Sequence, residues 1–170
     1  MKYISTRGNA PVLSFEDAML AGLARDGGLY VPETVPRMTS ADIIGMVGLS
    51  YEEIALRVIQ PFVGDSFSEA ELIDSISVAY AGFNHTARAP LVQLGPNHHL
   101  LELFHGPTLA FKDFAMQLIG QLFQRALNRR GERVTIVGAT SGDTGAAAIE
   151  AFKGLDTVDV FILFPNGKIS

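Results

Sequence analysis

Residues 133–164 read RVTIVGATSGDTGAAAIEAFKGLDTVDVFILF, and this stretch decides the fold class. Its two ends, Arg133–Val137 and Val158–Phe164, have the β-branched and apolar residues of strands that are buried on both faces. Between them, small residues lead into Ala146–Phe152, an alanine-rich stretch that favours a helix. Strand, helix and strand in this order predict a right-handed crossover and a parallel sheet with helices on both faces. The predicted fold class is therefore α/β.

The stretch before this unit predicts a hairpin and a long helix. Two apolar runs, Leu91–Leu94 and Leu100–Leu103, flank a turn at Gly95–Asn97. A helix is expected from Lys112 to about Arg129, and Gly131 is expected to end it. Its inward face should carry residues at helical spacing, namely Phe114, Leu118, Leu122, Phe123 and Leu127.

Residues 1–87 are predicted to form a small, mostly helical domain. Two pairs have the spacing of a capping box at a helix start, with a hydroxyl three residues before a carboxylate: Ser50 with Glu53, and Ser68 with Glu71. The helices that follow should turn inward Ile54, Ala55, Val58, Ile59 and Phe62 in the first and Leu72, Ile73, Ile76, Val78 and Tyr80 in the second. Residues 88–170 are then the first part of a second domain.

The second domain is expected to be incomplete. Its last predicted strand ends six residues before Ser170. A parallel sheet that stopped there would expose a long apolar edge, which natural domains avoid. The sequence is therefore expected to be a truncated piece of a longer protein.

Composition and charge narrow the function classes. The chain has 48% hydrophobic residues, a formal net charge of −5 and no basic run longer than Arg129-Arg130, so nucleic-acid and anionic-membrane binding are not expected. It has no cysteine, which excludes disulfides, thiolate metal sites and cysteine nucleophiles. No apolar run approaches the ~20 residues that span a bilayer, and the amino terminus lacks the pattern of a secretory signal. A cytoplasmic protein is the expectation.

Lys112 is the first candidate for chemistry. It lies between Phe111 and Phe114 at the predicted start of a helix, whereas a lysine is usually a solvated surface charge. An amine attacks a carbonyl only when it is unprotonated; apolar neighbours and a helix amino terminus favour the neutral form, while Asp113 opposes it. Lys112 can therefore be a covalent cofactor anchor. The alternative is a surface lysine whose stem covers the two phenylalanine rings.

Gly138–Gly145, with the sequence GATSGDTG, is the second candidate. Consecutive small residues between a strand and a helix leave backbone amides accessible at a helix amino terminus, where anions bind. A carboxylate or a phosphate would suit this loop, with hydroxyl donors from Ser141 and Thr144. The spacing matches neither the dinucleotide fingerprint nor the ATP-binding P-loop. The alternative is a glycine-rich turn in which a serine or an aspartate caps the helix.

The histidines are weaker candidates. His98 and His99 are adjacent beside a turn, and adjacent residues on a strand face opposite ways, so a shared metal ion is not expected. His105 could reach a site around Lys112, or it could be a structural histidine. Neither the H-E-x-x-H metal motif nor the G-x-S-x-G nucleophile motif is present, and no metal site is predicted.

Phe104–Asp113, FHGPTLAFKD, and Ser141–Gly145, SGDTG, together resemble threonine synthase, a pyridoxal-phosphate enzyme of the tryptophan-synthase-β fold type. Tyr3–Gly8 and Asp26–Pro32 resemble the amino-terminal domain of the same family. The resemblance covers nearly all of the chain. It implies a small, mostly helical amino-terminal domain followed by the start of a pyridoxal-phosphate domain of fold type II.

The resemblance also implies a role for each motif residue. Lys112 would carry pyridoxal 5′-phosphate covalently and later move protons among Cα, Cβ and Cγ of the substrate, and Phe111 would lie against the cofactor. Asp143 stands where related enzymes have an asparagine that contacts the 3′-oxygen of the cofactor. An acid keeps this contact only if one of the two groups holds a shared proton. The substrate carboxylate would be bound by Thr140, Ser141, Gly142, Thr144 and Gly145.

The activity that the resemblance implies is a lyase reaction on a phosphorylated amino acid. Threonine synthases convert O-phospho-L-homoserine and water to L-threonine and phosphate by a β,γ-replacement. The binding partner is thus a small-molecule substrate, and the full-length protein is expected to be a monomer or a homodimer. The family's phosphate-binding Gly-Asn-Phe-Gly-Asp segment is absent, so the 170-residue chain by itself is expected to be inactive.

Two alternatives stay open. One is a serine or threonine dehydratase of the same fold type, although its lysine motif usually has a different flank. The other is a threonine-synthase-like binding or regulatory protein without catalysis, although Lys112 is the first residue that a non-enzyme could discard.

Overall fold

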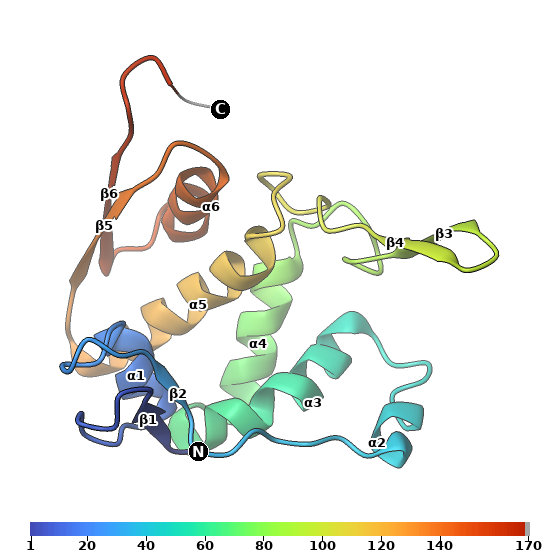
Figure 1. Cartoon of the computed structure of the whole chain (residues 1–170), viewed down its shortest axis with the longest axis horizontal. Coiled ribbons are helices and arrows are strands. Elements are labelled where there is room, and N and C mark those ends of the chain that lie inside the picture. The colour runs from blue at the N-terminus through green and yellow to red at the C-terminus, as the bar shows by residue number, and fades with distance from the viewer. Residues whose placement is uncertain (169–170) are drawn as a thin grey trace. The chain divides into compact units, whose positions relative to one another are not determined.

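The computed structural model describes residues 1–168, and the chain divides into two compact units, Met1–Asp74 and the part that begins at Ser75. The boundary falls inside a helix, α4 (Glu69–Tyr80), so this helix contributes to both units. The domain boundary that the sequence predicts after residue 87 stays a prediction. Figure 1 labels the helices and strands of both units. Within the described residues, none of the helices is both long enough and apolar enough to span a bilayer.

The first unit combines a small sheet with helices. β1 (Tyr3–Ser5) pairs antiparallel with β2 (Tyr30–Pro32). The helices are α1 (Phe15–Ala21), α2 (Ser40–Ile44), α3 (Tyr51–Val63) and the first part of α4, with a single 3-10 turn, η1 (Gly64–Ser66), between α3 and α4. The apolar centre of the unit includes the rings of Tyr3, Phe15 and Phe67, which pack edge to face, and the buried side chains of Val63 and Leu72.

Local hydrogen bonds start these helices where the sequence predicts. The Ser50 hydroxyl accepts a bond from the Glu53 N–H at 3.2 Å, and the Glu53 carboxylate accepts one from the Ser50 N–H at 2.8 Å. Ser68 and Glu71 make the same two bonds at 3.3 and 2.8 Å. Both predicted capping boxes are therefore confirmed.

The inward faces of these helices differ from the prediction at two valines. Val78 of α4 is 51% exposed and Val58 of α3 is 39% exposed, although both were expected to face inward. Residues three and four positions apart share a helix face. The buried Ile76 and Tyr80 are four positions apart, whereas Val78 is two positions from each and therefore lies on another face. The buried face of α4 consists of Leu72, Ser75, Ile76, Ala79 and Tyr80.

In the second unit, β3 (Leu91–Gly95) and β4 (His98–Leu101) form an antiparallel hairpin. β4 begins two residues earlier than the predicted strand 100–103 and ends before Glu102. The cause is the turn: Gly95 pairs with His98, so two residues connect the strands, and a turn of this length sets the register. Most side chains of both strands are exposed.

The rest of the unit is a helix followed by a strand, a helix and a strand. These are α5 (Asp113–Arg130), β5 (Val134–Ala139), α6 (Asp143–Phe152) and β6 (Val158–Leu163). β5 and β6 pair in parallel, from Val134 with Val158 to Ala139 with Leu163. The C-cap of α5 is Gly131, which has the left-handed φ of 64° that glycine adopts at little cost. α6 begins three residues before the predicted Ala146.

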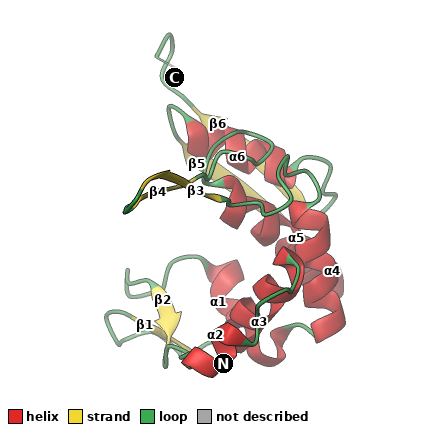
Figure 2. Cartoon of the chain, turned by 90° about the vertical axis from the view of Figure 1, so that its right-hand side faces the viewer, coloured by secondary structure: helices red, strands yellow, loops and turns green. Residues whose placement is uncertain are grey.

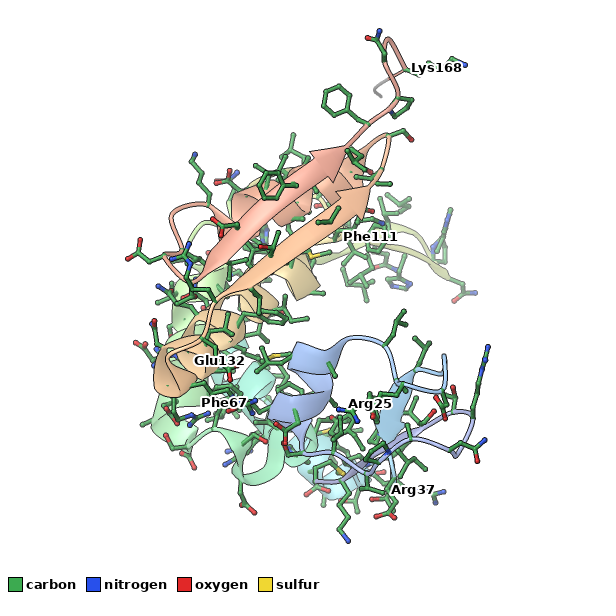
Figure 3. The ribbon with its side chains drawn as sticks, turned by 90° about the vertical axis from the view of Figure 1, so that its left-hand side faces the viewer. Arg25, Arg37, Phe67, Phe111, Glu132 and Lys168 are labelled. Atoms are coloured by element: carbon green, nitrogen blue, oxygen red, sulfur yellow. The ribbon has the colours of Figure 1, made fainter. Side chains whose placement is uncertain are left out.

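One face of β5 and β6 packs towards α6, and the other face is exposed (Figures 2 and 3). Val158, on the covered face, is only 6% exposed, whereas Val137, Phe161 and Leu163 on the other face are 66%, 60% and 63% exposed. The expectation that these strands are buried on both faces is therefore not met within residues 1–168. The physical reason is that only one of the two faces has a helix against it there.

Candidate functional site

The loop before α5 is built around Gly106 and Asp113. Asp113 is fully buried, and its carboxylate accepts hydrogen bonds from the N–H and the hydroxyl of Thr108 at 2.8 and 2.7 Å. A Cβ at position 106 would lie 2.5 Å from Oδ2 of Asp113, so only glycine fits there. Leu109 has a φ of 62°, a left-handed conformation that is rare for a bulky residue. These contacts restrain the backbone conformation of the loop.

Lys112 stands at the N-cap position of α5, directly after this loop, and is half-buried. Its Nζ lies 4.3 Å from the ring centre of Phe111, which is cation–π geometry. Figure 3 labels Phe111. Lys112 lines a pocket of about 590 Å³. The residues that form this pocket are Leu103, Phe111, Lys112, Phe114, Ala115, Met116 and Thr144. Lys112 is the one charged side chain among these wall residues, so the pocket is an apolar cavity with a single amine.

The predicted anion loop leads directly into α6. Gly142 is the N-cap residue, its N–H donates to the Thr140 hydroxyl at 3.3 Å, and no side chain caps the helix. The alternative in which a serine or an aspartate caps α6 is therefore wrong. In the first turn the N–H of Gly145 donates to the Gly142 carbonyl at 3.0 Å, and the partial positive charge of this helix end makes it a candidate site for an anion.

Gly145 has a packing role in the same loop. A Cβ at this position would lie 2.6 Å from Cγ2 of Thr140 and 3.2 Å from Cγ2 of Ile162. Glycine therefore lets the first turn of α6 approach both the loop and β6. Its expected role in substrate binding stays a prediction.

The two motifs meet at one residue. Thr144 lines the pocket of Lys112 and Phe111, whereas its loop neighbours from Thr140 to Asp143 and Gly145 line a second pocket of about 300 Å³. The second pocket is formed by Thr140, Ser141, Gly142, Asp143, Gly145, Ala146, Ile149, Ile162 and Phe164. Asp143 and Gly145 flank Thr144 in the chain, so a single loop forms part of both pockets. The structure thus brings Lys112, Phe111 and Thr144 together and places Asp143 in the adjoining pocket.

His105 has its own partner. Its Nε2 lies 2.7 Å from Oε2 of Glu102, and its ring lies 5.0 Å from that of His85. It is absent from the wall of the Lys112 pocket, which favours the structural interpretation of this histidine. Among residues 1–168, no group of histidine, aspartate and glutamate side chains has an arrangement that could hold a metal ion.

Sequence reasoning missed the bond pair between Thr108 and Asp113. It considered Asp113 only as a charge beside Lys112, whereas the carboxylate is committed to Thr108. The available signal was a hydroxyl five residues before an acid at the start of a helix. That spacing predicts no standard cap, so only the folded loop reveals the contact.

The site therefore lies in an α/β unit, with a lysine at the start of one helix, α5, and a glycine-rich loop at the start of the next helix, α6. Residues 2–80 match the family described as "Threonine synthase N terminus". Over all 170 residues the chain is 58% identical to threonine synthase from Pseudomonas aeruginosa, and it covers 36% of that protein.

Solved structures give the same result. The chain superposes on the PLP-bound threonine synthase from Brucella melitensis with a TM-score of 0.96 and 59% identity, over 100% of this chain and 37% of that one. For threonine synthase from yeast the TM-score is 0.93 at 42% identity, over 99% of this chain and 36% of that one. By sequence and fold the chain is related to threonine synthases along its whole length, which confirms the resemblance that the two motifs indicate. It spans about 36% of the length of the curated relative from Pseudomonas aeruginosa.

Proposed function

We propose that the protein containing this chain is a pyridoxal-phosphate-dependent threonine synthase, which converts O-phospho-L-homoserine and water to L-threonine and phosphate. The observation that carries the proposal is the shared pocket of Lys112 and Thr144, because it joins the lysine motif to the anion loop. The relationship to threonine synthases along the whole chain supports it. A phosphorylated amino acid fits a site that offers one amine and one anion-binding helix end.

The pocket around Lys112 is suitable for pyridoxal phosphate. Its volume of about 590 Å³ lies within the range of small-molecule sites, and its walls are mainly apolar. Lys112 would hold the cofactor covalently, with Phe111 beside it. When bound, the cofactor supplies an electron sink that stabilises negative charge on the substrate carbon next to the amino group.

The second task proposed for Lys112 is proton transfer. Once its amine is free of the cofactor, it can take and return protons at Cα, Cβ and Cγ of the substrate, since these atoms would lie in the same pocket. The wall residues of this pocket include no second titratable side chain that would compete with the amine for these protons. Leu103, Phe114 and Met116 provide apolar walls.

The anion loop is proposed to hold the substrate carboxylate. The partial positive charge at the amino terminus of α6 would attract this carboxylate, and the loop residues at that helix end are Thr140, Ser141, Gly142, Thr144 and Gly145. Asp143 is proposed to face the 3′-oxygen of the cofactor through a shared proton, because two ionised oxygens would repel each other. Thr144 links the two functions, since it also borders the lysine pocket.

The larger architecture belongs to the same proposal. We assign residues 1–87 to an amino-terminal threonine-synthase domain and residues 88–170 to the first part of a fold-type-II domain. In the complete domain, helices would cover both faces of the parallel sheet. The protein would be cytoplasmic and act as a monomer or a homodimer.

Reductive labelling of the full-length protein tests this function. Borohydride should reduce the link between cofactor and lysine, and peptide mapping should find the pyridoxyl mass on the peptide that contains Lys112. Lys112→Ala should lose the label and at least about a hundredfold in turnover of O-phosphohomoserine, whereas the surface variant Lys153→Ala should keep both. A label on Lys153 or Lys168 would contradict the assignment, and turnover of serine in place of phosphohomoserine would favour the dehydratase.

A further inference from the structure

Asp113 is a buried charge that the proposed chemistry does not use. Its side chain is 0% exposed, and a buried carboxylate is costly unless hydrogen bonds compensate it. Both of its oxygens are engaged by one residue: Oδ2 accepts from the Thr108 N–H at 2.8 Å, and Oδ1 accepts from the Thr108 hydroxyl at 2.7 Å. The carboxylate of Asp113 therefore binds a residue five positions earlier in the chain, Thr108.

This contact closes the loop that leads to the lysine. The segment from Thr108 to Asp113 contains Phe111 and Lys112, and its two ends are joined by the two bonds of the carboxylate. Inside it, Leu109 has a left-handed backbone, which persists only where the surrounding structure holds it. The hydrogen-bonded pair supplies such a restraint.

The start of α5 depends on the same contact. Lys112 is at the N-cap position, and its side chain makes no capping bond. The restraint at this helix end comes instead from the first helical residue, Asp113, which reaches back into the loop. Gly106 leaves the space that this arrangement needs, because a Cβ there would lie 2.5 Å from Oδ2 of Asp113.

We propose that Asp113 and Thr108 are positioning residues for Lys112. They hold the backbone on both sides of the lysine, so that its amine enters the pocket next to Thr144 and Phe111. Neither residue lines that pocket, and both act through the backbone. The inference rests on the proposed function, since it gives Lys112 a chemical task that needs a defined position.

The test uses four variants of the full-length protein. Thr108→Val removes the hydroxyl donor and keeps the shape of the side chain, and Asp113→Ala removes the acceptor. Asp113→Asn is the conservative variant, because an amide can accept from the Thr108 N–H and donate to its hydroxyl oxygen. Thr157→Val is the matched control: Thr157 is buried in the same unit, and its hydroxyl has no hydrogen-bond partner.

Amide hydrogen exchange in the cofactor-free protein is the first measurement. In Thr108→Val and Asp113→Ala, exchange of the amides in residues 108–113 should be roughly tenfold faster or more, because a local opening is no longer held closed. Asp113→Asn and Thr157→Val should exchange like the wild type. The second measurement, on the cofactor-loaded protein, is kcat together with the pH midpoint of the absorbance of the lysine-bound cofactor. Thr108→Val should lose at least about tenfold in kcat and shift that midpoint, while Asp113→Asn keeps most of the activity.

Unchanged exchange and unchanged kcat in Thr108→Val would overturn the inference. A lower melting temperature with wild-type kcat and midpoint would also overturn it, because the pair would then be structural only. Failure of the proposed function is separately visible: the wild type would carry no label on Lys112. The exchange rates of the cofactor-free variants would still decide whether the loop is held by this pair.

Discussion

The carboxylate of Asp26 organises the turn between α1 and β2 in the first unit. Its oxygens accept from the Ser5 hydroxyl at 2.7 and 2.8 Å and from the N–H groups of Asn9 and Gly28 at 2.9 and 3.0 Å. These bonds favour the ionised form, and they hold the pKa of Asp26 below its ordinary value of 3.8, with the Ser5 hydroxyl as the largest cause. One side chain thus joins β1 to a turn more than twenty residues later.

This network predicts an acid-sensitive stability. Because the pKa of Asp26 is lower in the folded chain, the stabilisation is complete above about pH 4 and is lost as the pH falls below the ordinary value of 3.8. Ser5→Ala removes the largest cause, so the decrease of melting temperature with falling pH should become shallower in that window. Glu33→Gln, which changes a carboxylate outside the network, should retain the wild-type slope between about pH 4 and 2. An unaltered slope in Ser5→Ala would show that Asp26 does not contribute.

At the scale of elements, the contact between α5 and α6 determines how the two motifs meet. α5 begins next to Lys112, and α6 begins in the anion loop, so their packing sets the distance between the two. Gly120 of α5 is buried, and a Cβ there would lie 2.5 Å from the carbonyl oxygen of Ala151 in α6. A glycine in mid-helix costs helix propensity, but here it permits close approach of the two backbones.

Gly120→Ala tests this contact. The added methyl group should force α5 and α6 apart, and this effect should outweigh the gain in helix propensity of about 1 kcal/mol. We expect a net loss of roughly 1–3 kcal/mol in the free energy of unfolding, measured with urea. Gly82→Ala is the control, because a Cβ at that position meets no atom within 4 Å and its stability should be near that of the wild type. Equal stability of the two variants would refute the close contact.

In the chain as a whole, one face of the strands β5 and β6 leaves apolar side chains exposed. The open face of β5 and β6 carries Val137, Phe161 and Leu163, each at least 60% exposed. Exposed apolar strand surface promotes association between chains. The described residues alone do not cover this face.

Solubility of the 170-residue chain checks this point. Phe161→Lys places a charge on the open face and should raise the concentration that stays in solution, measured after centrifugation. Val158→Lys places the same charge on the covered face, where Val158 is 6% exposed, and should instead destabilise the unit. If Phe161→Lys lowered the solubility or the melting temperature as much as Val158→Lys, the face would not be open.

The features that could be predicted from sequence are those that neighbouring residues decide. The capping boxes of Ser50 and Ser68 form between groups three residues apart, so any chain with these residues can make them when the helix starts. The end of α5 at Gly131 and the hairpin at Gly95 depend on equally local backbone preferences. The chemistry of Lys112 and of the small-residue loop also follows from residue types.

Tertiary packing decided the rest. Only the folded chain places Thr144, of all the loop residues, in the pocket of Lys112, because that contact joins segments more than thirty residues apart and depends on how α5 and α6 pack. It also turned Asp113 towards Thr108, paired His105 with Glu102 and left one face of β5 open. Residue types determined the chemical groups that this chain offers. Packing between distant segments determined which of these groups meet, because that choice depends on burial and contacts that no short window of sequence contains.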